Sequence, residues 1–360
     1  MSKLQQAVRH RAKSMLLILL AILCSLLVGA GFLLLAGYHP LDAYAGIVAG
    51  AFGSKMAITQ TLTKSTPLLL IGLAIAVAFK GSSFNIGAEG QFYAGTLGCV
   101  LCEQFFHTMD LPSWLIIPLC LLCSFAFGAL WGAIPGYLKA VRGSSEVVTS
   151  VMLSSLMVLL VKYLVGIGGP IAEPRGIYPE TLEITEAAKL PYIVPGTRLH
   201  LGFLIALMMA ALVYFFLERT TWGYKIKATG LNADSAQYGG INVGLVTIST
   251  MAVSGAIAGL AGGIEVLGMA WKLYPGLSPG YGYNGIAVAL LGRLHPVGII
   301  FSALLFGMLN TGSGQMARSV GIPSTLASIL QALVLIFVVG FSILEKKKLL
   351  HTKKGGTANV

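Results

Sequence analysis

Residues 15–36 read MLLILLAILCSLLVGAGFLLLA, an apolar run of 22 residues without a single charge. A helix rises about 1.5 Å per residue, so about 20 apolar residues cross the roughly 30 Å of hydrocarbon in a bilayer. Residues 1–14, which precede the run, are basic, with Lys3, Arg9 and Arg11 among them. A cleavable signal sequence has a shorter apolar core, so we predict a retained transmembrane helix.

The rest of the chain shares this apolar character. Of its 360 residues, 56% are hydrophobic and only 10% are charged, which leaves too little polar surface to face water on every side. The formal net charge is +11, but the basic residues occur in short segments between apolar runs. This placement indicates orientation in a membrane instead of nucleic-acid binding.

The sequence contains ten apolar runs. A backbone amide in hydrocarbon must be paired within its own segment or buried in protein, and lengths near twenty residues are those of helices. We therefore predict an all-α polytopic membrane protein whose transmembrane domain, residues 15–344, contains about ten helices. A cytoplasmic segment, 1–14, and a cytoplasmic basic tail, 345–360, flank it. The ten runs are 15–36, 66–79, 84–106, 114–136, 147–166, 201–217, 243–268, 284–291, 297–311 and 323–344.

Basic residues are distributed unevenly between the two sides of this arrangement. With the N-terminus in the cytoplasm, sixteen of the 24 Lys and Arg residues lie inside and the other eight outside. Inner loops of membrane proteins carry such an excess. We therefore predict a multi-pass membrane protein with both termini in the cytoplasm.

Two connecting segments are long enough to contact other proteins. Residues 168–200 lie outside in this topology and contain five prolines and four glutamates, so we expect a loop that receives a soluble partner. Residues 218–242 lie inside, and their mixture of charge, Gly and Ala suits a short surface helix. This inner loop is the expected attachment point for a cytoplasmic motor.

Two of the runs, 66–79 and 284–291, are short for a bilayer crossing, and one lies in each half of the chain. Short or Gly-interrupted segments in both halves point to the substrate site of transporters that are built from inverted repeats. We predict broken helices at these two places and an inverted repeat that relates them.

Polar residues lie beside both short runs. Asn85, Glu89 and Gln91 stand at the start of run 84–106, and Asn284 begins the second short run. A carboxylate in such a place is costly unless it faces a polar cavity or a partner, so we predict that these four residues line the path and hydrogen-bond a polar solute. The alternative for Glu89 is structural, because the dipole and free amides of a helix N-terminus also favour a carboxylate.

Other polar and small residues lie within the runs. Glu146, Glu265 and Gln331 are compatible with a structural role. Glu146 and Glu265 are close enough to run ends to reach water, and we rank both below Glu89 as path residues. Glycines recur at steps of four residues on one helix face in two runs, where they predict close helix packing. These glycines are Gly128, Gly132 and Gly136 in one run and Gly255 and Gly259 in the other.

Cysteine pairs match the spacing of a four-cysteine zinc site. Cys99 and Cys102 form one pair, and Cys120 and Cys123 form the other. Zinc-binding pairs normally lie on turns, whereas these lie inside apolar helices, where cysteine behaves as a small hydrophobe. We therefore predict no metal site, and we regard a disulfide between the two helices as a weaker alternative.

Nucleotide-binding motifs are missing or incomplete. Gly280, Gly282 and Gly285 have the spacing of a dinucleotide fingerprint, but the strand before it and the acidic residue after it are lacking, which favours a flexible hinge. The phosphate-binding pattern Gly-x-x-x-x-Gly-Lys-Ser/Thr does not occur. We therefore predict that this chain binds no cofactor and that a partner subunit uses any ATP.

Four segments resemble the permeases of bacterial ATP-binding-cassette (ABC) importers, in the branched-chain amino acid and simple sugar group and especially its nucleoside-type members. They are 84–91 (FNIGAEGQ), 146–153 (EVVTSVML), 230–241 (GLNADSAQYGGI), and 283–292 (YNGIAVALLG) with 295–298 (HPVG). The resemblance covers nearly the whole chain.

This resemblance implies an assembly and a mode of action. The core would be a heterodimer with a second homologous permease subunit, served by two cytoplasmic ATPase subunits and an extracytoplasmic solute-binding protein. Residues 221–241 would contain the coupling helix that rests in a groove of the ATPase. The family-like positions in it are Gly230, Asn232, Ala236, Tyr238 and Gly240.

The function that follows is import of nucleosides or related small sugar-containing solutes by alternating access, without covalent chemistry in this chain. The alternative is an ion-coupled secondary transporter that uses Glu89, Glu146 or Glu265 as a proton carrier. A membrane enzyme built on the cysteine pairs is a weaker alternative, because no His/Asp/Glu cluster accompanies them. Purine nucleosides, pyrimidine nucleosides, free bases and plain sugars all remain open as solutes.

Overall fold

The computed structural model describes most of the chain between residues 23 and 323. Its described secondary structure is helical apart from one antiparallel β-bridge between Tyr192 and His200. The predictions for residues 1–14, for the tail 345–360 and for Gln331 lie outside the described residues. The described residues are 20, 23–109, 111–174, 176–323, 325, 328, 329, 332, 333, 336, 337 and 340.

The predicted helical class is confirmed. Within the described part, six helices are long and apolar enough to cross a membrane. A seventh span is reached if the bent pair Leu23–Leu35 and Pro40–Phe52 (α2), which meet at 119°, counts as one. The six helices are α3 (Lys55–Lys80), α5 (Ser113–Arg142), α6 (Glu146–Val165), α7 (Gly202–Arg219), α10 with its extension (Val243–Ala270) and α12 (Pro296–Val320).

Two further predicted runs correspond to helices that are not among these six. Run 84–106 is α4 (Ala88–Phe106), and run 284–291 is α11 (Tyr281–Leu291). The last predicted run, 323–344, falls largely outside the described residues. The total of about ten spans therefore stays a prediction.

The first predicted short span is wrong. Residues 66–79 are the second half of α3, which has 26 residues and a length of about 39 Å. Its first half was overlooked because it is rich in hydroxyl side chains, and these are paired with the helix's own backbone. Thr63 Oγ1 donates to the carbonyl of Thr59 (2.9 Å), and Thr66 Oγ1 donates to that of Leu62 (3.0 Å). Of the two predicted short spans, only 284–291 falls on a short helix, the 11-residue α11, so the pair of short spans that suggested an inverted repeat is lost.

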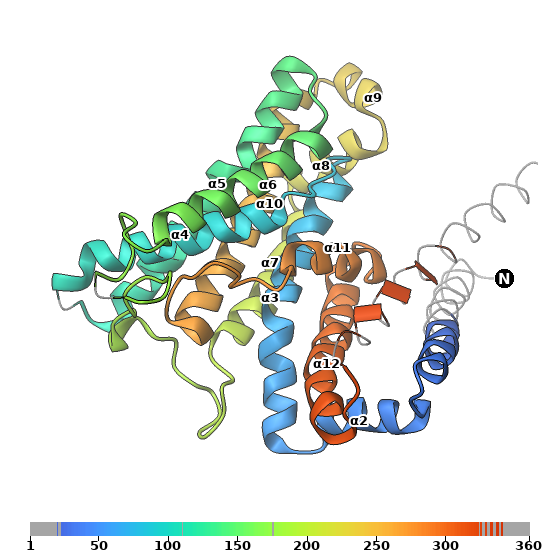
Figure 1. Ribbon diagram of the computed structural model, residues 1–360. Coiled ribbons are helices and arrows are strands. Elements are labelled where there is room, and N and C mark those ends of the chain that lie inside the picture. The colour runs from blue at the N-terminus through green and yellow to red at the C-terminus, as the bar shows by residue number, and fades with distance from the viewer. Residues whose placement is uncertain are drawn as a thin grey trace, which may run out of the picture. The chain divides into compact units, whose positions relative to one another are not determined.

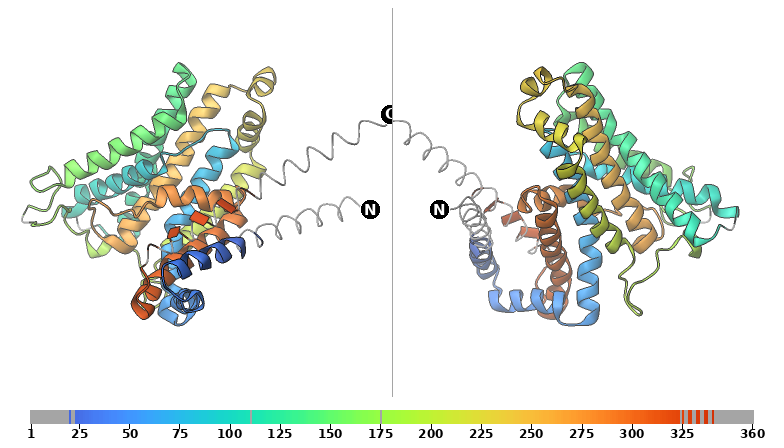
Figure 2. Two further views of the ribbon diagram at one scale, coloured as in Figure 1. Left: turned by 45° about the vertical axis from the view of Figure 1, so that its right-hand side comes forward. Right: turned by 180° about the vertical axis from the view of Figure 1, so that it is seen from behind.

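The structure divides into two compact units, one formed by residues 59–307 and the other by 1–58 with 308–360. In the larger unit, α4, α5 and α10 pack along one another (Figures 1 and 2). The prediction that the glycine faces of α5 and α10 allow close helix packing is confirmed. A Cβ on Gly128 would overlap the carbonyl oxygen of Gly255, and one on Gly132 would overlap that of Met251. The absence of side chains therefore lets the two backbones touch.

A π-helical turn continues α10 over Val266–Ala270, and the loop 168–200 is fastened to it and to the residues that follow. The backbone amides of Thr181, Ile184 and Leu190 donate to the carbonyls of Leu273, Trp271 and Leu267 at 2.9–3.0 Å. This loop and the segment between α7 and α10 lie at opposite ends of the larger unit (Figures 1 and 2).

In the smaller unit, the helix 23–35, α2 and the final turns of α12 share a small apolar core. Close approach again depends on glycine, because a Cβ on Gly312 would overlap the carbonyl oxygen of Ile47. The core residues are Leu33, Ala43, Ile47, Leu309, Met316 and Ile322.

Candidate functional site

Asn85 and Gln91, two of the predicted path residues, are joined directly. Asn85 lies in the turn between α3 and α4, residues 81–87, which we call the α3–α4 turn. Its Nδ2 donates to Gln91 Oε1 (2.7 Å) and to Ser254 Oγ of α10 (2.8 Å), and Gln91 Nε2 donates back to Asn85 Oδ1 (3.1 Å). Both side chains are fully buried, at 0% and 1% exposed. In this conformation the two amides anchor the N-terminal end of α4 to α10.

Glu89 connects the starts of two helices. It lies in the first turn of α4 and is 6% exposed, and its Oε2 accepts a hydrogen bond of 2.6 Å from the backbone amide of Gly282 in α11. A carboxylate at a helix N-terminus satisfies a free amide and complements the helix dipole. The two helices can approach closely there because residue 282 is a glycine; a Cβ at this position would overlap the backbone nitrogen of Glu89. Asn284, half-buried, lies in the same first turn of α11.

The structure adds polar residues that the sequence analysis missed. Ser278 lies two residues before Gly280, the N-cap of α11; its Oγ accepts from the amide of Tyr281 (2.9 Å), and its own amide donates to Tyr93 Oη (3.0 Å). Tyr281 Oη in turn donates to Glu265 Oε1 (3.4 Å), and the Phe92 and Tyr281 rings meet edge to face. A serine shortly before a short apolar run can pair with a free amide of a helix start, and this pattern could have been found in the sequence. The contacts of Ser278 with α4 and of Tyr281 with α10 could not have been found in the sequence.

The segment between α7 and α10 forms two short helices, α8 (Thr221–Leu231) and α9 (Ala233–Tyr238). A side chain caps the N-terminus of each helix. Thr220 Oγ1 accepts from the amide of Gly223 (3.1 Å), and Asn232 Oδ1 accepts from that of Ser235 (2.8 Å). Such caps satisfy free amides at a helix start, so these N-terminal hydrogen bonds stabilise two helices that are too short to gain much from their own length. We call residues 218–242 the coupling segment.

Each family-like residue of the coupling segment has a distinct place. Asn232 is the N-cap of α9, Ala236 lies on the buried face of α9, and Gly240 has a positive φ of 81°. Tyr238 is 94% exposed, with its side chain in solvent. A Cβ on Gly230 would overlap the carbonyl oxygen of Lys80 at the end of α3, so this position requires a glycine.

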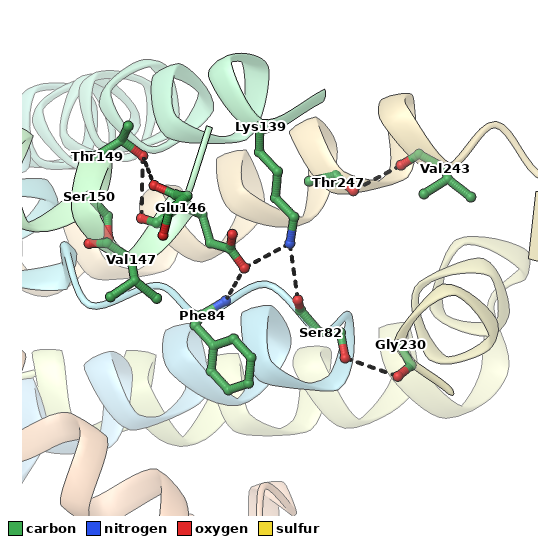
Figure 3. Close-up of polar contacts among 11 residues, drawn as sticks. Ser82, Phe84, Lys139, Glu146, Val147, Thr149, Ser150, Gly230, Val243 and Thr247 are labelled. Carbon is green, nitrogen blue, oxygen red and sulfur yellow. Dashed lines mark hydrogen bonds and ion pairs between the residues drawn. The ribbon is translucent and has the colours of Figure 1, made fainter. Parts of the chain in front are cut away.

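Figure 3 shows a chain of polar contacts between the coupling segment and the α3–α4 turn. Ser82 Oγ donates to the carbonyl of Gly230 (3.0 Å), and the Ser82 carbonyl accepts from Lys139 Nζ (3.2 Å). The same Lys139 Nζ pairs with Glu146 Oε1 at 2.7 Å, and that oxygen accepts from the amide of Phe84 (3.4 Å). Glu146, which we ranked below Glu89, therefore holds the residue next to Asn85.

The four cysteines of α4 and α5 are free thiols. Among the residues that the structure describes, no group of three or more His, Cys, Asp and Glu side chains is placed to hold a metal ion. The absence of a metal centre stays a prediction.

Comparison with known proteins gives a consistent result. The family model for the permease component of branched-chain amino acid transport systems matches residues 57–339. The guanosine ABC transporter permease protein NupP of Bacillus subtilis is 36% identical over 334 residues, which cover 91% of this chain and 94% of that protein. The nucleoside ABC transporter permease protein NupB of Lactococcus lactis is 34% identical, with 93% of each chain covered. The glucose ABC transporter permease protein TsgB13 of Haloferax volcanii is 31% identical, over 89% of this chain and 86% of that one.

Proposed function

The chain belongs to the family of permease components of branched-chain amino acid transport systems, and on that premise we propose that it imports nucleosides or related sugar-containing solutes as the membrane-spanning subunit of an ABC importer. Two relatives whose names give nucleosides as solutes, NupP and NupB, match more than nine tenths of this chain, and the glucose relative supports a wider class of sugar-containing solutes.

The observation that carries this proposal is the form of the coupling segment. Two short capped helices present the almost fully exposed side chains of Leu231 (88%) and Tyr238 (94%), while Ala236 faces inward. Large exposed apolar and aromatic side chains on a rigid support are typical of a docking surface. We assign this surface to a groove of a cytoplasmic ATPase subunit.

The remaining parts of the assembly follow from this assignment. ATP is hydrolysed by the ATPase subunits, since this sequence has no phosphate-binding loop. A second homologous permease completes the path, and a solute-binding protein delivers the solute to the loop 168–200. The chain spans the inner membrane about ten times and has both termini in the cytoplasm.

The mechanism is alternating access. Closure of the ATPase dimer moves the docked α8 and α9, and the helices that carry Glu89 and Asn284 change their relative position so that the path opens to one side at a time. The permease supplies a gated path with weak binding, and the solute-binding protein supplies the affinity. Asn85 and Gln91 contribute to the path from the buried end of α4.

Transport in proteoliposomes tests the function. We expect the assembled complex, with its ATPase subunits and loaded binding protein, to take up labelled guanosine or uridine only when ATP is present on the ATPase side. Uptake should stop when the phosphate-loop lysine of the ATPase is replaced. Uptake that survives this replacement and follows an imposed proton gradient would establish the ion-coupled alternative. Competition by adenosine, uridine, free bases, ribose and glucose then defines the solute class.

A further inference from the structure

We propose that the α3–α4 turn is the element that transmits movement of the coupling segment to the path residues, with Ser82, Lys139 and Glu146 as its positioning residues. This inference rests on the proposed function and deepens it, because it names the residues through which the motor would act. None of the three needs to touch the ATPase or the solute.

The first link joins α8 to the turn. The Gly230 backbone lies against the carbonyl of Lys80, the last residue of α3, and Ser82 Oγ donates to the Gly230 carbonyl (3.0 Å). Glu218 adds a second connection, because its carboxylate pairs with Lys227 of α8 (2.9 Å) and with Lys80 (3.5 Å). A shift of α8 therefore acts directly on the end of α3 and the start of the turn.

The second link clamps the turn from its other side. Only three residues, 143–145, connect α5 and α6, and Gly143 adopts a φ of 65° to close this helical hairpin. Lys139 in the last turn of α5 and Glu146 in the first turn of α6 form an ion pair across it (2.7 Å). In Figure 3 the turn lies between this hairpin and α8.

The Lys139–Glu146 pair does more than complement the dipoles of the two helix ends. It also forms hydrogen bonds with the backbone of the turn, at the Ser82 carbonyl (3.2 Å) and the Phe84 amide (3.4 Å). A cap for the hairpin alone would need neither contact. The pair thus binds the turn at two places, separated by Ser83.

The third link leads from the turn into the path. Asn85 follows Phe84 directly, and its buried amide is held by Gln91 and by Ser254, whose own Oγ donates to the Ala74 carbonyl (2.7 Å). Glu89, one helical turn further on, holds the amide of Gly282. Close-packed buried groups of this kind move together and do not deform singly, so displacement of the turn reaches both α4 and α11.

Two features indicate that this region has a second arrangement. Ser82 has a positive φ of 50°, a strained conformation for a residue other than glycine. Three buried hydroxyl oxygens in the elements that meet here have no hydrogen-bond partner among the described residues: those of Ser83 in the turn, Thr229 in α8 and Thr250 in α10. Buried polar groups normally find partners, so an alternative position of the turn would gain hydrogen bonds that this one lacks.

The test measures the number of solute molecules imported per ATP hydrolysed by the complete complex in proteoliposomes. We expect Lys139→Met and Glu146→Gln each to lower this ratio about fivefold or more, with ATP hydrolysis at least as fast as in the wild type. The double variant should be no worse than either single variant, since both remove one connection. Lys139→Arg should restore the ratio to within about twofold, because it keeps the charge and donor.

Lys162→Met serves as the matched control, because Lys162 lies exposed on α6, outside the turn and its contacts. Wild-type ratios in both Lys139→Met and Glu146→Gln would overturn the proposal, as would losses of hydrolysis and import in equal proportion. If these variants fail to retain the ATPase subunits on purification, Ser82→Ala decides: a lowered ratio supports the link to Gly230, and an unchanged one overturns it. Failure of the proposed function is a separate result, namely a wild-type complex without ATP-dependent uptake.

Discussion

The two ends of the larger unit are held together in different ways. At the end that carries the coupling segment, side chains hold the α3–α4 turn: the Ser82 hydroxyl donates to the Gly230 carbonyl, and Lys139, paired with Glu146 of the α5–α6 hairpin, donates to the Ser82 carbonyl. At the opposite end, the loop 168–200 is fastened by three backbone hydrogen bonds to the region that follows α10. Lys189 reinforces the loop through Glu183 (2.7 Å), Glu186 (2.6 Å) and the Trp271 ring.

From this difference we predict that the coupling end moves during transport and that the loop end stays fixed. Side-chain contacts to a turn can be exchanged without unfolding any helix, whereas backbone hydrogen bonds between two segments break only when the segments part. Substitutions at the coupling end should therefore change transport more than stability. Substitutions at the loop end should do the reverse.

The largest effect is expected for Gly230→Ala. The added Cβ would overlap the Lys80 carbonyl, so α8 must move away from the α3–α4 turn. We expect import per ATP to fall about a hundredfold, toward the upper range of coupling between sites. Gly239→Ala is the control, because its Cβ would lie 3.3 Å from the nearest atom and its φ is negative. Equal import by both variants would contradict a specific role for Gly230.

A smaller effect on transport is expected for Glu89→Gln. The amide oxygen can still accept from Gly282, but the charge that complements the starts of α4 and α11 is lost. We expect uptake to fall about tenfold, the loss that belongs to about 1.4 kcal/mol, with assembly unchanged. Uptake equal to the wild type in a correctly assembled complex would remove Glu89 from the path and leave its structural role.

At the loop end, Glu103→Ala should alter stability and spare the coupling. Glu103 is buried in α4, and its Oε1 accepts from the amide of Thr185 in the loop (2.9 Å). Loss of this hydrogen bond should cost about 1 kcal/mol, measurable as a lower thermal midpoint of the purified complex. Glu103→Gln keeps an acceptor, so its thermal midpoint should lie between those of the wild type and Glu103→Ala. A fall in import per ATP at unchanged stability would break the distinction between the ends.

The smallest effect concerns pH and His200, which closes the loop. Burial lowers the pKa of His200 from 6.5 to about 4, and the neutral ring accepts from the Gly202 amide (3.2 Å). The unfolded chain binds a proton near pH 6.5 and the folded chain does not, so His200 weakens stability as the pH falls through this range. Between pH 7.5 and 6.0 the loss is about 0.8 kcal/mol. In His200→Asn, thermal midpoints should lose this part of their pH dependence, and an unchanged dependence would contradict it.

Much of the helical arrangement followed from the sequence, and its errors have physical causes. The glycine steps at Gly128 and Gly255 correctly predicted close helix packing, because spacing along a helix alone determines which residues share a face; that α5 and α10 pack on each other came from the structure. The length of α3 was misjudged because hydropathy counts a threonine as polar even when its hydroxyl is paired within the helix, as in Thr63. The helix α2 was not predicted.

The site was predictable in part. Asn85, Glu89 and Gln91 were singled out because polar groups at the start of an apolar helix are costly. The structure brings Asn85 and Gln91 into contact, and the role of all three in the path stays a prediction. Lys139 and Ser82 were not found, since neither type of residue is unusual near the end of a membrane helix. Their importance depends on which backbone groups they meet.

By itself, the amino-acid sequence determined the helical class, the membrane as solvent and the family, because apolar run length and local motifs are properties of neighbouring residues. Only the tertiary structure decided which polar groups meet. Ser82 and Gly230 are 148 residues apart, Asn85 and Ser254 are 169 apart, and Glu89 and Gly282 are 193 apart. Such pairs form when packing brings distant segments within hydrogen-bond reach, and no local pattern records that distance.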